Sequence, residues 1–572
     1  MIGAMLKHRS LSLIVLLALV ASVLAACLAS RSPSTGSGSP AQQKTAQPTP
    51  VHPLPAVTNT SPITRVPVGI STPFSSLSPD LSPTSPLPQA PTFVPNVAAS
   101  ASPTPSSQAL DAPAPLPKTQ YNLTAELNYD QHHLAVTEQI TYTNHANEAL
   151  NDLVLMVDPM YYGDCDVRRT CATLGAFKLN RLTWADGQPV ENYNTETRCC
   201  VGSLTNVAIS GSLRLPLRQP LPPGASLGLS LAYELSLPSP TPDPQTRPVP
   251  FGYTAKQTNL VDWYPFVAPY VTGKGWLAHP AGYFGEHLVY DIADFQVNVR
   301  LVGGRQGLTV AASAPAVIDG DWRRYQFNSA RNFVWSVSHD YQVASETVGD
   351  VTVLSYFFPI HPTAGQAALK TTAQALALYS ELYGPYRHAT LTVVEADFLD
   401  GMEYDGLYFL SNGFYNLYQG QPGDYLVSIA AHETAHQWWY GLVGDDQAME
   451  PWLDEALATY SERLFYERVY PEGLDWWWNY RVDYYQPRGW VDSNIYNSGS
   501  WRAYRDAVYL NGAHFLEDLR KQIGDAAFFA FLKDYAAQYA GRIAAGDDFF
   551  NLLKQHTQTD ITPLLKKYFS SR

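Results

Sequence analysis

Tyrosine and tryptophan are absent from the first 118 residues of this 572-residue chain, although the whole chain holds 36 Tyr and 13 Trp. Residues 28–118 instead hold 20 of its 44 prolines. A segment of this kind buries too little apolar surface to offset the entropy lost on folding. We therefore expect residues 27–118 to form a disordered Pro/Ser/Thr-rich stalk, and the 454 residues after Lys118 to fold into two or three domains.

Basic residues are also scarce. Beyond Lys118 the chain has 31 Lys and Arg against 49 Asp and Glu, a net charge of −18. Such a surplus of acid repels phosphate backbones and anionic lipid headgroups. We therefore expect no nucleic-acid partner.

An apolar run occupies residues 11–26, between Lys7 with Arg9 and the single Cys27. It is shorter than the ~20 residues of a spanning helix. Small residues before a cysteine resemble the lipobox of bacterial lipoproteins, in which residues 1–26 are the signal peptide and Cys27 carries the lipid. An ordinary signal peptide or an anchor helix is the alternative. The resemblance implies an extracytoplasmic protein, lipid-anchored to a bacterial membrane.

Only four further cysteines are present, and they are Cys165, Cys171, Cys199 and Cys200. In an oxidising compartment an even number predicts disulfides, with three possible pairings. A zinc site is the alternative, but two adjacent cysteines fit a tetrahedral site poorly. The cysteines are therefore candidate disulfide partners within an insertion at about residues 164–201.

Residues 119–348 predict an N-terminal, largely antiparallel β-rich domain. Polar and apolar residues alternate at 122–129, 139–143 and 294–301, the period of a half-buried strand. Residues 349–572 differ. Helix formers fill 364–382 up to Gly384 and Pro385, one strand follows at 390–394, and the rest is expected to be mainly helical. The fold class predicted is α+β and multidomain.

Two histidines lie four residues apart in His432-Glu433-Thr434-Ala435-His436. The surrounding stretch has no Gly or Pro and should be helical until Gly441. On a helix both imidazoles share a face, so both can reach one metal ion, with Glu433 beside it as a base. Two such histidines are otherwise ordinary packing or surface residues, so a further ligand is required.

Glu455 can supply that ligand. Pro451 suits the start of a second helix, and Glu455 lies about one turn into it. An antiparallel pair of helices would bring Glu455 over the imidazoles, leaving an open fourth position, as in catalytic zinc sites. Thr459, one turn further, could support a ligand or bond back to its own helix.

These residues resemble the aminopeptidase N and leukotriene hydrolase family of gluzincin zinc peptidases. The resemblance rests on residues 432–439, on the spacing to Glu455 and on residues 452–460. Residues 400–404 and 508–513 look like the family's Gly-x-Met-Glu-Asn and Tyr-x-x-Gly-Ala segments. The resemblance implies a saddle-like β-rich domain followed by a thermolysin-like zinc peptidase domain.

The resemblance implies one zinc ion on His432, His436 and Glu455, with Glu433 as the general base that activates the zinc-bound water. Tyr509 would donate a hydrogen bond to the developing oxyanion. Without the resemblance, Tyr509 would be interpreted as a residue that packs in the core. The implied activity is removal of N-terminal residues from peptides.

The segment around Glu403 would bind the substrate, with Glu403 on the free α-amine and Gly401 and Met402 beside it. Glu403 could also be a solvated carboxylate on an edge strand. Tyr404 and Asp405 depart from the family pattern, and its second amine-binding residue is unassigned. Glu286 and Gln257 are candidates, although a surface position is expected for either.

Only 63 residues follow Tyr509, so we expect no large C-terminal helical domain. An open cleft makes a zinc endopeptidase the main alternative, and a non-catalytic surface-binding lipoprotein is a second. The aromatic residues of 475–490 could line a pocket for apolar side chains, but packing is favoured. Asp445, Asp446 and Asp454 are expected to be solvated charges at helix ends.

Overall fold

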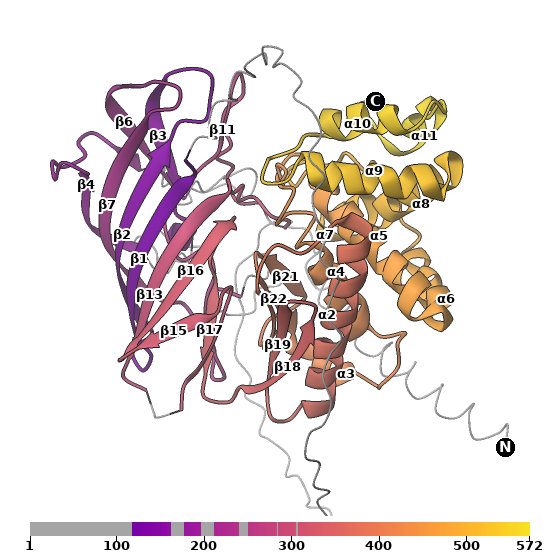
Figure 1. Ribbon diagram of the computed structural model, residues 1–572, viewed down its shortest axis with the longest axis horizontal. Coiled ribbons are helices and arrows are strands. Elements are labelled where there is room, and N and C mark those ends of the chain that lie inside the picture. The colour runs from indigo at the N-terminus through magenta and orange to yellow at the C-terminus, as the bar shows by residue number, and fades with distance from the viewer. Residues whose placement is uncertain (1–116, 162–176, 196–210, 240–249, 283, 305–306) are drawn as a thin grey trace, which may run out of the picture. The chain divides into compact units, whose positions relative to one another are not determined.

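The computed structural model describes residues 117–161, 177–195, 211–239, 250–282, 284–304 and 307–572. These residues all belong to one of the two compact units of the chain, Gln108–Arg572. A β-rich half is followed by a half built of one sheet and many helices (Figure 1), as the sequence predicts. The helices of the described residues include none that is long and apolar enough to cross a membrane. The cysteines, the apolar leader and the stalk lie outside the described residues.

The β-rich half is built on a seven-stranded sheet in the order β15-β16-β13-β1-β2-β7-β4. Strands β1 and β2 alternate buried residues with more exposed ones, as predicted, because one face covers the core. The pairing is antiparallel except between β1 and β13, which are parallel. The bounds are β1 (Thr119–Asn128), β2 (His133–Thr143), β4 (Phe177–Trp184), β7 (Ser226–Ser236), β13 (Ala293–Val302), β15 (Ala316–Asp319) and β16 (Trp322–Ala330).

Three smaller sheets complete this half, in the orders β10-β3-β6-β5, β14-β17-β9-β8 and β11-β12. Their strands are β3 (Leu150–Met156), β5 (Asn194–Thr195), β6 (Ser212–Leu221), β8 (Gly252–Tyr253), β9 (Thr258–Leu260), β10 (Phe266–Val267), β11 (Tyr270–Val271), β12 (Gly275–Trp276), β14 (Thr309–Ala312) and β17 (Trp335–Ser338).

The second half begins with a five-stranded sheet in the order β18-β19-β20-β22-β21. Its strands are β18 (Gln342–Val348), β19 (Val351–Phe357), β20 (Thr390–Ala396), β21 (Gly401–Tyr404) and β22 (Leu407–Ser411). Strands β21 and β22 lie in a region that was expected to be helical. Both faces of the sheet are buried: Tyr408 and Leu410 pack into the core of the helical half, and Leu407 and Phe409 into the core of the β-rich half.

Helices pack against one face of this sheet. The predicted helix at 364–382 is present as α2 (Pro362–Tyr383). The others are α3 (Asn412–Leu417), α4 (Tyr425–Ala435), α5 (Trp452–Val469), α6 (Leu474–Trp476), α7 (Trp501–Arg505), α8 (Asn511–Ile523), α9 (Asp525–Gln538), α10 (Gly546–His556) and α11 (Thr562–Tyr568). α11 is the last helix of the described residues.

Arg331 of the β-rich half joins the two halves next to α4. Its guanidinium donates to the carbonyls of Tyr440 (2.5 Å), Gly441 (2.9 Å) and Leu442 (3.2 Å), and to those of Tyr290 (2.8 Å) and Arg542 (2.9 Å). Tyr440 accordingly adopts a φ of +121°, which bulky residues rarely adopt. α4 therefore ends at Ala435 rather than near Gly441, because the following loop turns toward Arg331.

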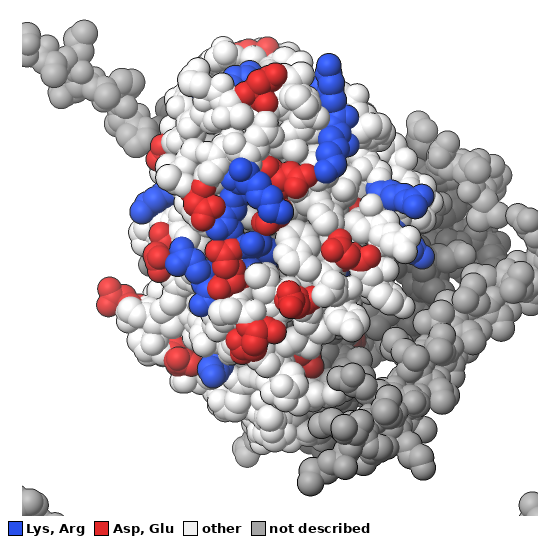
Figure 2. All heavy atoms as spheres, turned by 90° about the vertical axis from the view of Figure 1, so that its right-hand side faces the viewer, with Lys and Arg blue, Asp and Glu red and all other residues white. Residues whose placement is uncertain are grey.

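Charges are mixed on the face of the helical half that Figure 2 turns to the viewer. Lys and Arg lie among Asp and Glu there, and much of the surface carries neither. Lys567 and Asp518 of the helical half form an ion pair at 2.8 Å. The acidic surplus of the chain is thus not gathered into a single-sign patch on this face.

Candidate metal and catalytic site

Helices α4 and α5 bring the three expected zinc ligands together. His432 and His436 lie one turn apart at the end of α4, and Glu455 lies in the first turn of α5. The two Nε2 atoms are 3.0 Å apart, and Oε2 of Glu455 is 3.2 Å from Nε2 of His432 and 3.5 Å from that of His436. All three residues are buried.

The other ring nitrogens are both hydrogen-bonded. Nδ1 of His432 lies 2.9 Å from Oε1 of Glu462, and Nδ1 of His436 lies 2.9 Å from the carbonyl oxygen of Trp439. Each Nδ1 therefore donates, which leaves a lone pair on each Nε2. Two lone pairs and a carboxylate oxygen that converge on one point repel one another unless a cation lies between them. The donor set of two imidazoles and one carboxylate fits Zn²⁺.

The electrostatics of the site also favour positive charge. Burial lowers the pKa of His432, but Glu455 and Glu462 outweigh it and raise that pKa to about 9. Burial raises the pKa of Glu455, but hydrogen bonds from His432 and His436 outweigh it and lower that pKa to about 2. Glu455 is thus ionised, and a cation bound among these ligands would take the place of the proton that the two carboxylates favour on His432.

Glu462 is a functional residue that the sequence analysis missed. Its carboxylate is fully buried and accepts from Trp477 Nε1 (2.8 Å) and from Arg481 Nη2 (2.8 Å) and Nε (3.0 Å), as well as from Ser428. Burial opposes ionisation, but Arg481 outweighs it and lowers the pKa of Glu462 to about 2. A charged Glu462 holds the ring of His432 in place. Its spacing of seven residues from Glu455, two turns on one helix face, was the available signal.

Glu433 lies on the same helix and is buried. Its Oε2 is buried and has no hydrogen-bond partner among the described residues. Burial raises the pKa of Glu433 well above its usual range. Gly401 passes close by, since a Cβ there would lie 2.1 Å from Oε1 of Glu433. A buried carboxylate whose pKa is raised accepts a proton more readily than an ordinary carboxylate does.

Glu403 lies on β21 at the edge of the sheet, but it is 5% exposed, so the solvated alternative is wrong. Ligand atoms of Glu403, Glu433 and His436 all lie within 4.8 Å of one another. Nε2 of Gln447 donates to Glu403 (3.0 Å) and to Asp454 (2.9 Å). Gln447 was not predicted, because no pattern in the sequence marks a lone loop glutamine.

Tyr509 lies on a single-turn π-helix (Asp506–Leu510). Its hydroxyl donates to Oε1 of Glu455, and its ring stacks on His432 with centroids 6.0 Å apart. Burial raises the pKa of this phenol well above its usual range, so it remains a hydrogen-bond donor. π-turns are rare and often present functional side chains. A second π-helix (Trp477–Val482) presents Trp477 and Arg481 to Glu462.

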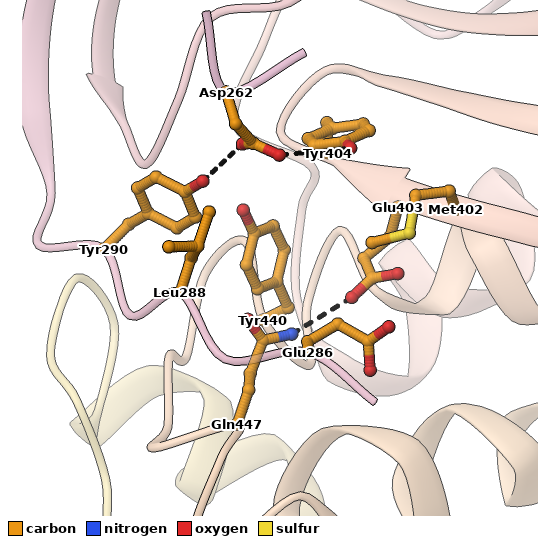
Figure 3. Close-up of a pocket in the computed structure, with 9 residues that line it drawn as sticks. All are labelled: Asp262, Glu286, Leu288, Tyr290, Met402, Glu403, Tyr404, Tyr440 and Gln447. Atoms are coloured by element: carbon orange, nitrogen blue, oxygen red, sulfur yellow. Dashed lines mark hydrogen bonds between the residues drawn. The ribbon is translucent and has the colours of Figure 1, made fainter. Parts of the chain in front are cut away.

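Three further residues named from the sequence, Glu286, Gln257 and Thr459, lie in different environments. Glu286 is half-buried and lines a pocket together with Met402 and Glu403 (Figure 3). Gln257 is buried away from that pocket, where it donates to the hydroxyl of Tyr341 at 2.7 Å. Thr459 is buried and its hydroxyl has no hydrogen-bond partner among the described residues.

The prediction of solvated helix-end charges is wrong for two of three acidic residues near α5. Asp445 and Asp454 are 4% and 1% exposed, and are therefore not solvated helix-end charges. Burial raises the pKa of both well above the usual range. Asp446 pairs with His279, whose Nε2 lies 2.9 Å from its carboxylate. In the aromatic cluster Trp477 is fully buried, as a packing role requires, whereas Tyr480, Tyr484 and Trp490 are exposed.

Comparison with known proteins decides the family. The model of the peptidase family M1 domain matches residues 367–568. This segment is a peptidase family M1 domain. The resemblance of this segment to the aminopeptidase N family of zinc metallopeptidases is thereby confirmed.

Curated relatives of the M1 domain are aminopeptidases at low identity. Aminopeptidase M1-B of Oryza sativa subsp. japonica is 27% identical over 216 residues, 35% of this chain and 25% of that protein. Aminopeptidase O of Homo sapiens is 23% identical over 252 residues, 38% of this chain and 30% of that protein. Leucyl aminopeptidase of Saccharolobus solfataricus is 23% identical over 157 residues, 25% of this chain and 20% of that protein. The chain thus spans less than a third of the length of these relatives.

Solved structures share the fold over both halves. The M1 zinc metallopeptidase from Deinococcus radiodurans superposes with a TM-score of 0.55 at 20% identity, covering 80% of this chain and 94% of that one. A mutant of that enzyme bound to a Tyr-Ser-Ala substrate gives a TM-score of 0.53 at 19% identity, covering 80% and 95%. The β-rich half and the M1 domain therefore follow the architecture of a two-domain M1 metallopeptidase.

Proposed function

We propose that this zinc metallopeptidase is an aminopeptidase that removes single residues from the N-termini of peptides. The observation that carries the proposal is the grouping of Glu403, Glu433 and His436 within 4.8 Å. A carboxylate that binds an ammonium group so close to the reacting centre leaves room for one residue before the scissile bond. Cleavage of the first peptide bond follows from that spacing.

His432, His436 and Glu455 would hold one zinc ion, which when bound supplies the Lewis acidity that activates water and polarises the scissile carbonyl. Glu433 takes a proton from the attacking water with its unpaired Oε2 and returns it to the departing nitrogen. Tyr509 then donates its hydroxyl hydrogen to the carbonyl oxygen as negative charge develops there. In the structure that hydroxyl bonds to Glu455, so this step requires it to change partner.

The substrate backbone would lie along β21. This strand is the edge of the five-stranded sheet, so an extended peptide can add to it through main-chain hydrogen bonds. Gly401 and Met402 start the strand, and the missing side chain of Gly401 lets the peptide pass close to Glu433. Glu403, held by Gln447, would bind the α-ammonium group, with Glu286 as the second carboxylate.

Peptides with free and acetylated N-termini test the proposal. The full chain is expected to release amino acids one at a time from free peptides, to lose this activity with a chelator, and to leave N-acetylated peptides intact. Glu433→Gln should abolish turnover while zinc content, measured by atomic absorption, stays at one per chain. Equal cleavage of acetylated peptides would indicate the endopeptidase alternative, and zinc binding without turnover on any peptide would favour the binding lipoprotein.

We also propose that Cys27 carries a lipid that anchors the enzyme outside the cytoplasm of a bacterium. The apolar leader that ends at this cysteine supports the proposal. The long proline-rich stalk would then separate the M1 domain from the membrane. Palmitate labelling of cells that express the chain should label it, and Cys27→Ser should abolish the label. A labelled Cys27→Ser chain would contradict the anchor.

A further inference from the structure

The pocket beside Glu403 is too small for a large side chain. Glu286, Met402 and Glu403 line it (Figure 3), and it has room for about one water molecule. A substrate whose ammonium group binds Glu403 therefore has to place a large first side chain elsewhere. That side chain still lies close to the reacting groups, because it is bonded to the same Cα as the ammonium group and the scissile carbonyl carbon.

Trp501 offers an exposed apolar surface next to Tyr509. It begins α7, where the side chain of the preceding Ser500 accepts from the backbone N–H of Ala503 at 3.2 Å and fixes the start of the helix. The indole lies edge-on to the ring of Tyr509, with centroids 5.9 Å apart and 75° between the planes. Trp501 is 40% exposed, whereas Tyr509 is 9% exposed. An open aromatic surface thus borders the phenol that is proposed to bind the scissile carbonyl oxygen.

Tyr504 connects this surface to the amine-binding side of the site. Its ring centroid lies 5.9 Å from those of both Trp501 and Tyr509. Its hydroxyl faces the segment that carries Glu286, since a Cβ on Gly285 would lie 3.1 Å from that oxygen. Tyr504 is fully buried, so Trp501 is the member of this ring cluster that offers its surface to a ligand.

We infer that Trp501 is a specificity-determining residue that selects peptides whose first residue has an aromatic side chain. The inference rests on the proposed binding of the α-ammonium group at Glu403 and Glu286. With that group held there and the carbonyl oxygen at Tyr509, the first side chain is left to contact the indole. Two aromatic rings that meet edge-on or offset gain more than the burial of their area alone, whereas a methyl group covers little of the indole.

Equilibrium binding separates this inference from the catalytic proposal. Zinc-loaded full chain carrying Glu433→Gln, which does not turn over, is titrated with phenylalanyl-alanine, alanyl-alanine and alanyl-phenylalanine. We expect phenylalanyl-alanine to bind at least about tenfold more tightly than alanyl-alanine. Adding Trp501→Ala should bring this ratio of affinities below about three. The ratio of alanyl-phenylalanine to alanyl-alanine should not change, because its ring belongs to the second residue.

Trp490→Ala is the matched control. Trp490 is exposed to a similar degree, 48%, but lies in a loop beside α11, where the next residue, Val491, donates to the carbonyl of Tyr568 at 2.8 Å. Its substitution should keep both ratios. A purely structural role of Trp501 behind Tyr509 would weaken all three peptides by the same factor and keep the ratios as well.

Equal affinities for phenylalanyl-alanine and alanyl-alanine, binding of none of the peptides, a ratio unchanged by Trp501→Ala, or a ratio lowered equally by Trp490→Ala would each overturn the inference. Trp501→Leu covers the case in which Trp501→Ala does not fold, as judged by thermal melting. It keeps apolar packing against Tyr509 but removes the exposed ring, so the ratio must fall at least about threefold, and an unchanged ratio overturns the inference. Failure of the wild-type chain to cleave free peptides would instead overturn only the catalytic proposal.

Discussion

The imidazole of His432 is hydrogen-bonded through Nδ1 to Glu462 at 2.9 Å, and Glu462 is in turn held by Arg481 at 2.8 Å. The ring thus lies between the proposed metal position and a buried, charged carboxylate. Such a carboxylate fixes the tautomer of the ring and raises its basicity as a ligand.

Glu462→Gln should therefore weaken zinc binding by about 10- to 100-fold, because the neutral amide no longer stabilises the donor tautomer of His432. Competition with a fluorescent zinc chelator measures the affinity. Glu472→Gln, at an exposed position just beyond the same helix, is the matched control and should leave the affinity unchanged. Equal zinc affinity in both variants would show that Glu462 serves packing alone.

Gly401→Ala should lower kcat by about 100-fold or more while zinc remains bound. The added Cβ would meet Oε1 of Glu433 at 2.1 Å and Cγ2 of Ile429 at 2.8 Å, so the general base has to move. Gly413→Ala is the control, because its Cβ would meet nothing closer than Oγ of Ser411 at 3.2 Å. A Gly401→Ala enzyme with normal kcat would contradict the position assigned to Glu433.

Tyr509→Phe should reduce kcat by about 10²- to 10³-fold with little change in KM, since the lost hydrogen bond forms in the transition state. Steady-state kinetics on an unblocked peptide measure both constants. Tyr504→Phe is the control, because the hydroxyl of Tyr504 is buried nearby without a hydrogen-bond partner among the described residues. A rise in KM at constant kcat would instead indicate that Tyr509 binds the ground state.

Glu138 gives the β-rich half a pH-dependent stability. It is fully buried on β2, and burial raises its pKa well above 4.5. Between 4.5 and the higher pKa, the folded state keeps a proton that the unfolded state has released. Stability is therefore highest below 4.5 and falls as the pH rises through this window. Each unit of difference in pKa costs about 1.4 kcal/mol.

Glu138→Gln removes this cost and should raise the melting temperature at pH 8 by about 2–4 °C for each kcal/mol recovered. The gain should shrink toward zero as the pH is lowered to 4.5. Thermal melts at a series of pH values measure it, with the exposed Glu191→Gln as the control. A gain that does not vary with pH would show that Glu138 is not protonated in the folded chain.

The parts of the site that lie close together in sequence were predictable. His432, Glu433 and His436 share one helix, and Glu455 begins the next, so helix geometry alone places them around one point. The alternation in β1 and β2 likewise predicts strands. The two extra strands β21 and β22 escaped prediction, because four or five buried residues show no period that separates a strand from a helix.

Contacts made by distant segments were not predictable. Gln447 meets Glu403 across 44 positions, and no local pattern records that pairing. Asp454 was expected in solvent because most helix-end carboxylates are there, but in the folded chain it accepts from Gln447 and from the backbone N–H of Glu455. Tertiary contacts thus bury a carboxylate that would usually be exposed to solvent.

Arg331 makes the geometry of the zinc ligands a property of both halves of the chain. Its hydrogen bonds end on the loop that follows His436, whereas Arg331 itself belongs to a segment that leaves the ribosome about 100 residues earlier. The β-rich half thus supplies the side chain that fixes the conformation of the loop after α4. A peptidase half produced alone lacks the donor that bends this loop, and exchange of domains between distant relatives must carry the arginine along with its carbonyl partners.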